Sequence, residues 1–242
     1  MNTERRQIVV GGLSVEIVRK AIKNLHLGVY PPNGRVRVAA PLAVSDHAVR
    51  VAVAGKLGWI KRQRARFAEQ PRQSRRDMVS GETHYFLGRR YRLRVIEHPG
   101  PGGVVLRNPT TLELRVRAGS DASTRDQILQ RWYRERLREL VPPLLAKWEP
   151  ILGVRAADWR IRKMKTRWGS CSVEARRIWL NLELVKKTAQ CLEYLVVHEL
   201  AHLVERRHND FFTQIMDANL PLWRRRRQEL NAAPLAHADW GY

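Results

Sequence analysis

The feature that most constrains this chain is the run His198-Glu199-Leu200-Ala201-His202. Residues four apart lie above one another on the same face of an α-helix. His198 and His202 can therefore offer two imidazole nitrogens to one metal ion, with Glu199 beside them. This H-E-x-x-H spacing is typical of helices that bind zinc. We expect a helix here, with both histidines on one face.

A third histidine extends this site. His208 follows His202 by six residues, far enough for the chain to leave the helix and return a third nitrogen to the metal. Three protein ligands and one open position are what a catalytic zinc ion requires. We therefore predict that His198, His202 and His208 bind Zn2+. The competing third ligand is a carboxylate from a later helix, and Glu229 is the candidate.

The turn after the second histidine differs from a familiar pattern. The spacing H-E-x-x-H-x-x-G-x-x-H has a glycine at the turn, where this chain has Glu205. The helix is therefore expected to run somewhat further before the chain turns back. We predict a helix from an N-cap at Thr188 to about Arg207.

The acidic residue of the motif suits the role of a general base. Zinc lowers the pKa of a bound water to about 7. Glu199 would take the proton of this water and then pass it to the amine that leaves when a peptide bond is cut. The residue that stabilises the oxyanion is left open, and the candidates are Tyr194, Arg167, His237 and Tyr242. Cys171 is either an inhibitory ligand of the metal or a packed turn residue.

The chain is strongly basic. Lys and Arg number 45 against 23 Asp and Glu, which gives a net charge of +22 and an isoelectric point of about 11.2. Such an excess favours polyanionic partners, nucleic acid above all. The basic residues gather in three stretches: Arg62, Arg64, Arg66, Arg72, Arg75 and Arg76; Arg160, Arg162, Lys163, Lys165 and Arg167; and Arg224 to Arg227. The alternative function is therefore non-specific binding of nucleic acid.

The cysteine content and the hydropathy of the chain indicate the cellular compartment in which we expect the protein. The two cysteines, Cys171 and Cys191, cannot build a disulfide framework or a four-thiolate zinc site. No run approaches the roughly 18–20 apolar residues that cross a bilayer, and the first residues have no apolar run long enough for a signal peptide. We expect a cytoplasmic protein with no membrane partner. The sequence does not give the oligomeric state.

Alternating patterns predict strands in the first half of the chain. Apolar and charged residues alternate over residues 7–40, and Gly-Gly and Pro-Pro-Asn-Gly runs mark turns there. Ser45 or Asp46 can cap a helix that runs to about Glu69. Further strands are predicted over residues 86–95, 104–106 and 112–116. We see no internal repeat in the sequence.

The second half is predicted to be mainly helical. The small polar run 118–124 marks the expected boundary between a β-rich N-terminal domain, residues 1–118, and a domain of residues 119–242 that contains the H-E-x-x-H helix. Pro142 and Pro143 should end or kink the first helix after this boundary. Strands are predicted near residues 159–165 and 177–182, with a turn at 168–172. The fold class is α+β, with a mostly antiparallel β portion followed by a helical portion.

Taken together, these motifs resemble the YgjP-like zinc metallopeptidases, a family related to the SprT-like and WLM peptidases. The matching features follow the family order along nearly the whole chain. They are Trp59-Ile60, Gly81-Glu82, Tyr85-Phe86-Leu87-Gly88, Trp132-Tyr133-Arg134, Arg167-Trp168-Gly169-Ser170-Cys171-Ser172, Leu180-Asn181 with Leu184, residues 193–202, and His208-Asn209-Asp210-Phe211-Phe212. Asn209 and Phe212 depart from the family, which more often has Ser and Trp there.

The resemblance implies a zincin-like fold and a peptide or protein substrate. It also implies that His198, His202 and His208 bind zinc and that Glu199 is the catalytic base. The strand at residues 178–182 is either the edge strand that binds an extended peptide or an ordinary core strand. A basic nucleic-acid-associated protein that acts on or near DNA-bound proteins remains the alternative.

Overall fold

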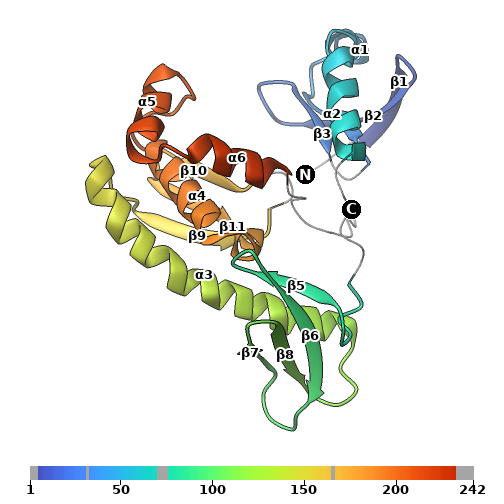
Figure 1. The fold of residues 1–242 in the computed structure, drawn as a ribbon. Helices are drawn as coiled ribbons and strands as arrows, with labels where there is room; N and C mark the ends of the chain where they lie inside the picture. The colour runs from blue at the N-terminus through green and yellow to red at the C-terminus, as the bar shows by residue number, and fades with distance from the viewer. Residues whose placement is uncertain (1–4, 31–32, 70–75, 165–166, 233–242) are drawn as a thin grey trace. The chain divides into compact units, whose positions relative to one another are not determined.

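The computed structural model describes residues 5–30, 33–69, 76–164 and 167–232. The chain divides into two compact units, the first ending at Pro71 and the second beginning at Arg72 (Figure 1). Both units contain sheets and helices, so the predicted α+β class is confirmed. Within the described residues, no helix is both long enough and apolar enough to cross a membrane.

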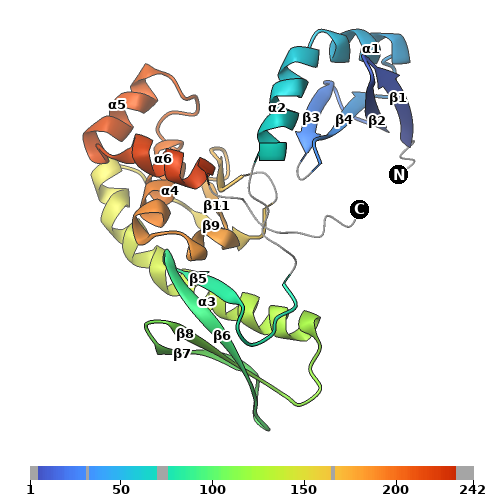
Figure 2. The same cartoon turned by 45° about the vertical axis from the view of Figure 1, so that its right-hand side comes forward.

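The first unit is a four-stranded sheet with two helices. The sheet has the order β1-β2-β4-β3, in which the outer pairs are antiparallel and the central pair β2/β4 is parallel. Helices α1 and α2 follow β4 (Figure 2). The elements are β1 (Arg5–Val10), β2 (Leu13–Lys20), β3 (His26–Tyr30), β4 (Arg35–Pro41), α1 (Asp46–Ala54) and α2 (Leu57–Glu69).

Alternation along the strands builds the core of this unit. Val15, Ile17 and Val38 are buried on one sheet face and share a core with Val53 of α1 and Ile60 of α2. The expected single helix over residues 45–69 is instead two helices. The first ends where Gly55 donates its backbone N–H to the carbonyls of Val51 and Val53, and the second begins at Leu57. The predicted N-cap Ser45 is confirmed, since its side chain accepts a hydrogen bond from the Ala48 N–H.

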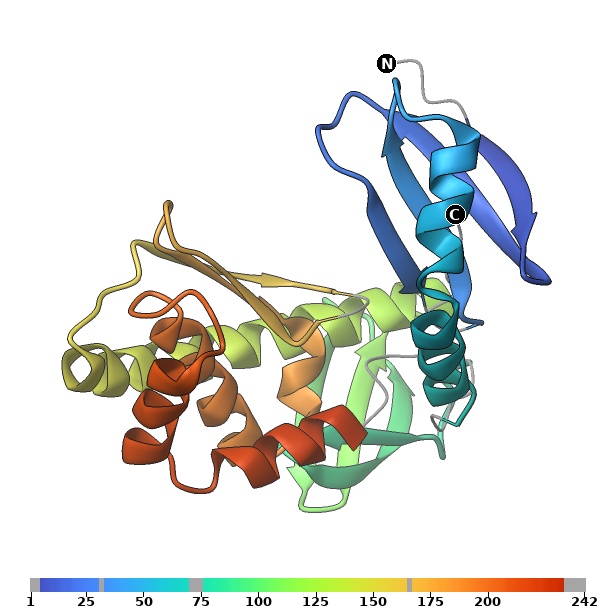
Figure 3. The same cartoon turned by 90° about the horizontal axis from the view of Figure 1, so that it is seen from above.

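The second unit begins with a sheet of the same topology. Its order is β5-β6-β8-β7, again with a parallel central pair, β6/β8, between antiparallel outer pairs. A long helix, α3, follows and runs along the unit (Figure 3). The elements are β5 (Thr83–Phe86), β6 (Arg89–Glu97), β7 (Gly103–Asn108), β8 (Thr111–Val116) and α3 (Ala122–Leu152).

Burial and turn positions recur between these two sheets at a constant spacing. The buried residues Ile17 and Leu93 are 76 residues apart (93 − 17 = 76). The same spacing separates Val38 from Leu114, Gly12 from Gly88, and the helix N-caps Ser45 and Asp121. The chain therefore contains an internal structural repeat, which we did not find in the sequence. Of these pairs only the glycines are identical, so the repeat lies in the burial pattern rather than in the side chains.

The two proline residues expected to end or kink α3 do not end it. The helix continues through Pro142 and Pro143 to Leu152. Its buried side, which includes Leu137, Val141 and Leu145, packs into one core along its length. This packing compensates for the backbone hydrogen bonds that the prolines cannot donate.

The predicted boundary between residues 118 and 119 falls inside the second unit. Leu112 and Leu114 of β8 belong to the same core as Leu129 and Leu137 of α3. The polar run between these elements is a short connection, because the strand before it and the helix after it bury their apolar sides against each other.

A third sheet carries the elements nearest to the motif helix. It consists of β9 (Asp158–Arg162), β10 (Gly169–Ser172) and β11 (Arg177–Asn181), in the order β10-β11-β9. The strand that we considered as the substrate-binding edge, residues 178–182, is therefore central. Of the residues predicted as a turn, 168–172, the last four instead form the edge strand β10. A 3-10 helix, η1 (Leu182–Lys186), follows β11.

Asn181 fixes the segment that leads into β10. Its buried amide nitrogen donates to the carbonyls of Met164 (2.8 Å) and Arg167 (2.7 Å), and its oxygen accepts from the Glu183 N–H (3.2 Å). We predict that Asn181→Leu lowers the free energy of unfolding by about 3 kcal/mol, because it leaves buried backbone groups unpaired. Urea denaturation followed by tryptophan fluorescence measures this change.

The matched control is Asn108→Leu, which removes an exposed asparagine that accepts from Thr110. It should change the unfolding free energy by less than about 0.5 kcal/mol. Equal losses in the two variants would contradict the role given to Asn181.

Candidate metal centre

The motif helix α4 (Ala189–Ala201) lies at the centre of the second unit. The Thr188 side chain caps it by accepting a hydrogen bond from the Cys191 N–H, as predicted. Leu192, Val196 and Leu200 are among its fully buried residues. A helix that is apolar nearly all round is a buried helix. Close packing around α4 therefore holds the backbone that carries the motif histidines in place.

The chain turns sooner after α4 than we expected. The helix ends at Ala201, and His202 is its C-cap, so the prediction of a helix to about Arg207 is wrong. The Glu205 side chain accepts from the Arg207 N–H (2.8 Å), and the Glu205 carbonyl lies 3.1 Å from Nδ1 of His202. These two contacts stabilise a turn that lacks the glycine of the H-E-x-x-H-x-x-G-x-x-H pattern.

The turn brings the third histidine back to the other two. One nitrogen each from His198, His202 and His208 lie within 4.8 Å of one another. The Nε2 atoms of His198 and His208 are 3.2 Å apart. Two nitrogens on one tetrahedral zinc ion would be about 3.3 Å apart, given Zn–N bonds of about 2.0–2.1 Å. The separation of His198 and His208 therefore matches that of two nitrogens on one zinc ion.

The imidazoles are held in the form that can bind a metal. Burial, together with the neighbouring His202 and His208, lowers the pKa of His198 to about 3. Burial also lowers the pKa values of His202 and His208. Neutral imidazole is the ligand form, so no proton needs to leave at neutral pH. If Nδ1 of His202 donates its proton to the Glu205 carbonyl, its Nε2 lone pair faces the cluster.

Phe212 supports all three imidazoles. It lies in α5 (Asp210–Asn219), whose N-cap Asn209 accepts from the Phe212 N–H (3.0 Å). Its ring stacks on His202 at 4.8 Å and meets His198 and His208 edge to face at 5.1 and 4.8 Å. One buried aromatic ring therefore restricts the orientation of every imidazole in the cluster.

Glu199 lies against the edge strand β10. A Cβ placed on Gly169 would be 2.3 Å from Oε1 of Glu199, so any side chain at this position would displace the carboxyl group. The Glu199 carboxyl is buried, and its Oε2 has no hydrogen-bond partner in the described part of the chain. Burial raises its pKa to about 8, while the charge of Arg167 acts in the opposite direction. A buried, unpaired carboxyl of raised pKa is suited to proton transfer.

Comparison with known proteins identifies the family. Residues 23–233 match the family described as "YgjP-like, metallopeptidase domain". The chain belongs to the YgjP-like metallopeptidase family. Among solved structures, the chain is similar to the metallopeptidase zymogen abylysin of Pyrococcus abyssi, at 24% identity and a TM-score of 0.35. That match covers 37% of this chain and 90% of that chain. Comparison with curated proteins gave no match.

Not every residue that we considered lies at this YgjP-like site. Glu229, the competing metal ligand, lies at the N-terminal end of α4, where it contacts Thr188 (3.3 Å) and Arg226 (3.0 Å). The oxyanion candidates Tyr194 and Arg167 lie beside His198 and Glu199, respectively. His237 and Tyr242 lie outside the described residues.

Cys171 lies on β10, two residues from Gly169. Burial, together with the charges of Glu199 and Glu174, raises the pKa of its thiol to about 11. Among the described residues, the clustered ligand atoms are those of the three histidines, and the thiol of Cys171 is not one of them. This favours the interpretation of Cys171 as a packed residue of the strand.

Sequence reasoning missed two residues of the site, Gly169 and Phe212, which were noticed only as parts of motifs. Arg227 was noticed only as part of a basic run. Arg227 lies in α6 (Trp223–Ala232), and its charge contributes to lowering the pKa values of His198 and His208 after burial and the neighbouring histidines. No spacing in the sequence indicates that α6 returns to α4.

Several residues of the basic stretches have acidic partners. Asp158 accepts from Arg160 (2.8 Å) and Arg177 (2.7 Å), and Arg226 pairs with Glu229. Arg66, Arg72, Arg75 and Lys165 have no described side chains. Nucleic-acid binding therefore stays a prediction.

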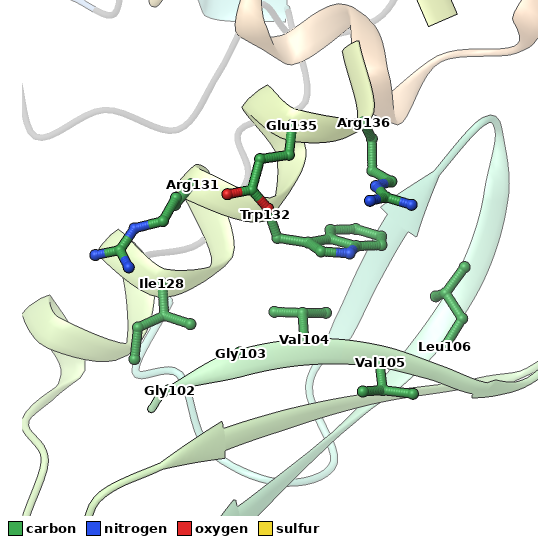
Figure 4. A pocket seen from close by; sticks show the side chains of 10 residues that line it. All are labelled: Gly102, Gly103, Val104, Val105, Leu106, Ile128, Arg131, Trp132, Glu135 and Arg136. Carbon is green, nitrogen blue, oxygen red and sulfur yellow. The ribbon is translucent and has the colours of Figure 1, made fainter. Parts of the chain in front are cut away.

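A separate hollow lies between β7 and α3 (Figure 4). Its volume is about 500 Å³, and its walls include Val104, Ile128 and Trp132. It shares no residue with the histidine cluster. Its lining contains no histidine or cysteine, so it is not a second metal site of the imidazole type.

We predict one bound zinc ion per chain. Elemental analysis of protein purified without a histidine tag should show it, and His198→Ala should lose it. A wild-type protein that is folded but free of metal under zinc-replete conditions would contradict the site.

The third ligand is tested separately. His208→Ala should weaken zinc binding by at least about tenfold, because it removes one of three ligands. Glu229→Ala should leave zinc affinity unchanged, since Glu229 lies at the other end of α4. Competition with a chromogenic chelator measures both affinities, and the reverse pattern would assign Glu229 as the ligand.

Proposed function

We propose that this protein is a zinc-dependent endopeptidase in which Glu199 is the general base. The observation that carries the proposal is the juxtaposition of three neutral imidazoles with a buried, unpaired carboxyl. Membership of a metallopeptidase family supports the reaction class. The choice of zinc, the role of Glu199 and cleavage within a chain are our own inferences.

Zinc suits this set of donors. Imidazole nitrogens bind zinc well, whereas magnesium and calcium prefer oxygen. When bound, the ion would polarise a peptide carbonyl and make a water molecule more acidic. The three histidines would hold it.

Glu199 would move the proton. A bound cation would lower the pKa of Glu199 and favour its carboxylate form. The unpaired Oε2 of this carboxylate can accept a proton from the attacking water, and the same oxygen can then donate that proton to the amine nitrogen of the leaving peptide. Burial strengthens this role, because the carboxylate has little solvation to lose when the substrate covers it. Gly169 leaves the space in which the carboxyl group lies.

The edge strand β10 would position the substrate. It pairs with β11 on one side only, so its other edge can pair with an extended peptide. Glu199 contacts the first residue of this strand. A peptide bound along an open edge can extend in both directions, which favours an endopeptidase over an enzyme that trims chain ends.

We predict that Glu199→Gln retains zinc but lowers peptide hydrolysis by at least about 100-fold. The amide has nearly the same shape but cannot accept the proton of the attacking water. Cleavage of denatured casein and elemental analysis measure the two properties. Cleavage at a rate near that of the wild type would exclude Glu199 as the base.

Gly169→Ala tests the geometry of the same carboxyl. The added methyl group would overlap with Oε1 of Glu199 and displace it, so activity should fall by about 100-fold while zinc stays bound. Gly103→Ala is the matched control, because a Cβ there meets nothing within 4 Å. Full activity in Gly169→Ala would show that the position of Glu199 is not critical.

A further inference from the structure

The hollow between β7 and α3 adjoins an open strand edge. In the described part of the chain, β7 pairs with β8 alone, so the backbone N–H and C=O groups along its other edge have no strand partner. Such an edge can bind an extended peptide as an additional strand. Residues 102–106, which include most of the first half of β7, also line the hollow. Backbone pairing and a side-chain pocket are therefore available at the same strand.

The side chains of β7 alternate between the hollow and the other face of the sheet. Val104 and Leu106 pair with buried leucines of β8, which places both on the core face. Figure 4 shows Val104 directed toward Trp132 of α3 and Val105 directed away from it. Leu106 is nevertheless 37% exposed. A peptide strand beside β7 would direct every second side chain to this face, where the hollow can take it up.

The first unit covers the corresponding position with its own helix. Val36 and Leu112 are equivalent in the repeat (112 − 36 = 76), and their strand partners are Val29 and Leu106. Val29 packs against the same core as Ile60 of α2, and α2 contacts β3. In the second unit α3 continues without a break, and Leu106 stays exposed. The apolar cover that one unit has is therefore missing in the other.

Positive charge surrounds the hollow. Arg131 and Arg136 lie in its helix wall (Figure 4), and Arg107 follows it on β7. Arg131 and Arg107 are exposed and have no ion-pair partner among the described residues, whereas Arg136 pairs with Glu139 (2.7 Å). Glu135 is the acidic residue of the lining. A second copy of this chain would bring the same arginines to the edge and be repelled, whereas an acidic segment would be attracted.

We propose that β7 and the hollow form a docking site for an extended acidic segment of a partner protein, which adds to the four-stranded sheet as a fifth strand. The segment has apolar side chains at alternate positions, which enter the hollow, and Asp or Glu near Arg131 and Arg107. The site shares no residue with the histidine cluster, so this inference does not depend on the proposed hydrolysis.

The test begins with labelled decapeptides that alternate Leu with Glu or Leu with Lys. Fluorescence anisotropy measures their binding to the full-length, zinc-loaded Glu199→Gln protein, which should not cut them. We expect the Leu/Glu peptide to bind at least about fivefold more tightly, the range of exposed ion pairs. No binding of the Leu/Glu peptide, or equal binding of both peptides, would overturn the inference.

Backbone methylation tests the addition of a strand. Two versions of the Leu/Glu peptide carry N-methyl groups on alternate residues, one on the odd and one on the even positions. The version whose blocked amides face β7 should bind at least about tenfold more weakly, because several hydrogen bonds are lost. The other version should bind nearly as well as the parent peptide. Equal binding of the two versions would contradict strand addition.

Substitutions assign the binding to this edge. Arg131→Glu should weaken binding of the Leu/Glu peptide by about fivefold. Arg138→Glu is its control, because it makes the same charge change two turns further along α3, outside the lining of the hollow. Leu106→Lys should weaken binding by at least about tenfold. Val9→Lys, at an exposed position of the edge strand β1, should leave it unchanged. Equal effects within either pair would place the peptide elsewhere and overturn the inference.

Sedimentation of the wild-type protein over a range of concentrations tests the alternative occupant. We expect a mass that does not rise through contacts of β7. A dimer that Leu106→Lys dissociates would show that this edge binds a second copy of the chain, and it would overturn the assignment to an acidic partner.

Discussion

The structure of the site depends on the close approach of α4 to the edge strand β10. Burying the Glu199 carboxyl without a partner is costly, so the surrounding fold must compensate for it. The apolar surface of α4 and the core residues around it do so, and Gly169 supplies the missing volume. Asn181 holds the segment before β10 in place from the neighbouring strand. The position of one carboxyl thus depends on residues from three segments that are distant in sequence.

The second constraint is the turn between α4 and α5. Glu205 organises it by side chain and backbone together, and His208 returns to the cluster as a result. The Phe212 ring then contacts the three imidazole rings and restricts their orientation. Because burial favours neutral imidazoles, each of the three rings can offer a nitrogen lone pair to a metal.

The first hairpin of the repeated sheet has different contacts in the two units. In the second unit, the turn Leu87-Gly88 of the first hairpin donates backbone hydrogen bonds to the carbonyls of Val185 and Lys186, just before α4. A Cβ on Gly88 would be 2.7 Å from Thr188, the N-cap of α4. The corresponding Gly12 of the first unit meets nothing within 4 Å. The same hairpin thus anchors the motif helix in one unit, whereas in the other unit a Cβ on the preceding Gly11 would be 2.8 Å from Leu57 at the start of α2.

The sequence by itself determined the α+β class, the motif helix with its N-cap Thr188, and the three histidines as candidates, because local spacing and alternation carry this information. It did not give the end of α4, because we took Glu205 at the position of the turn glycine as a sign of a longer helix, whereas Glu205 itself stabilises the turn. Tertiary structure alone decided that β10 is the edge strand, that α3 continues through its prolines, and that the sheet repeats. It alone placed Gly169 and Phe212 at the site. These features arise from packing between segments far apart in the chain, and no local pattern encodes such contacts.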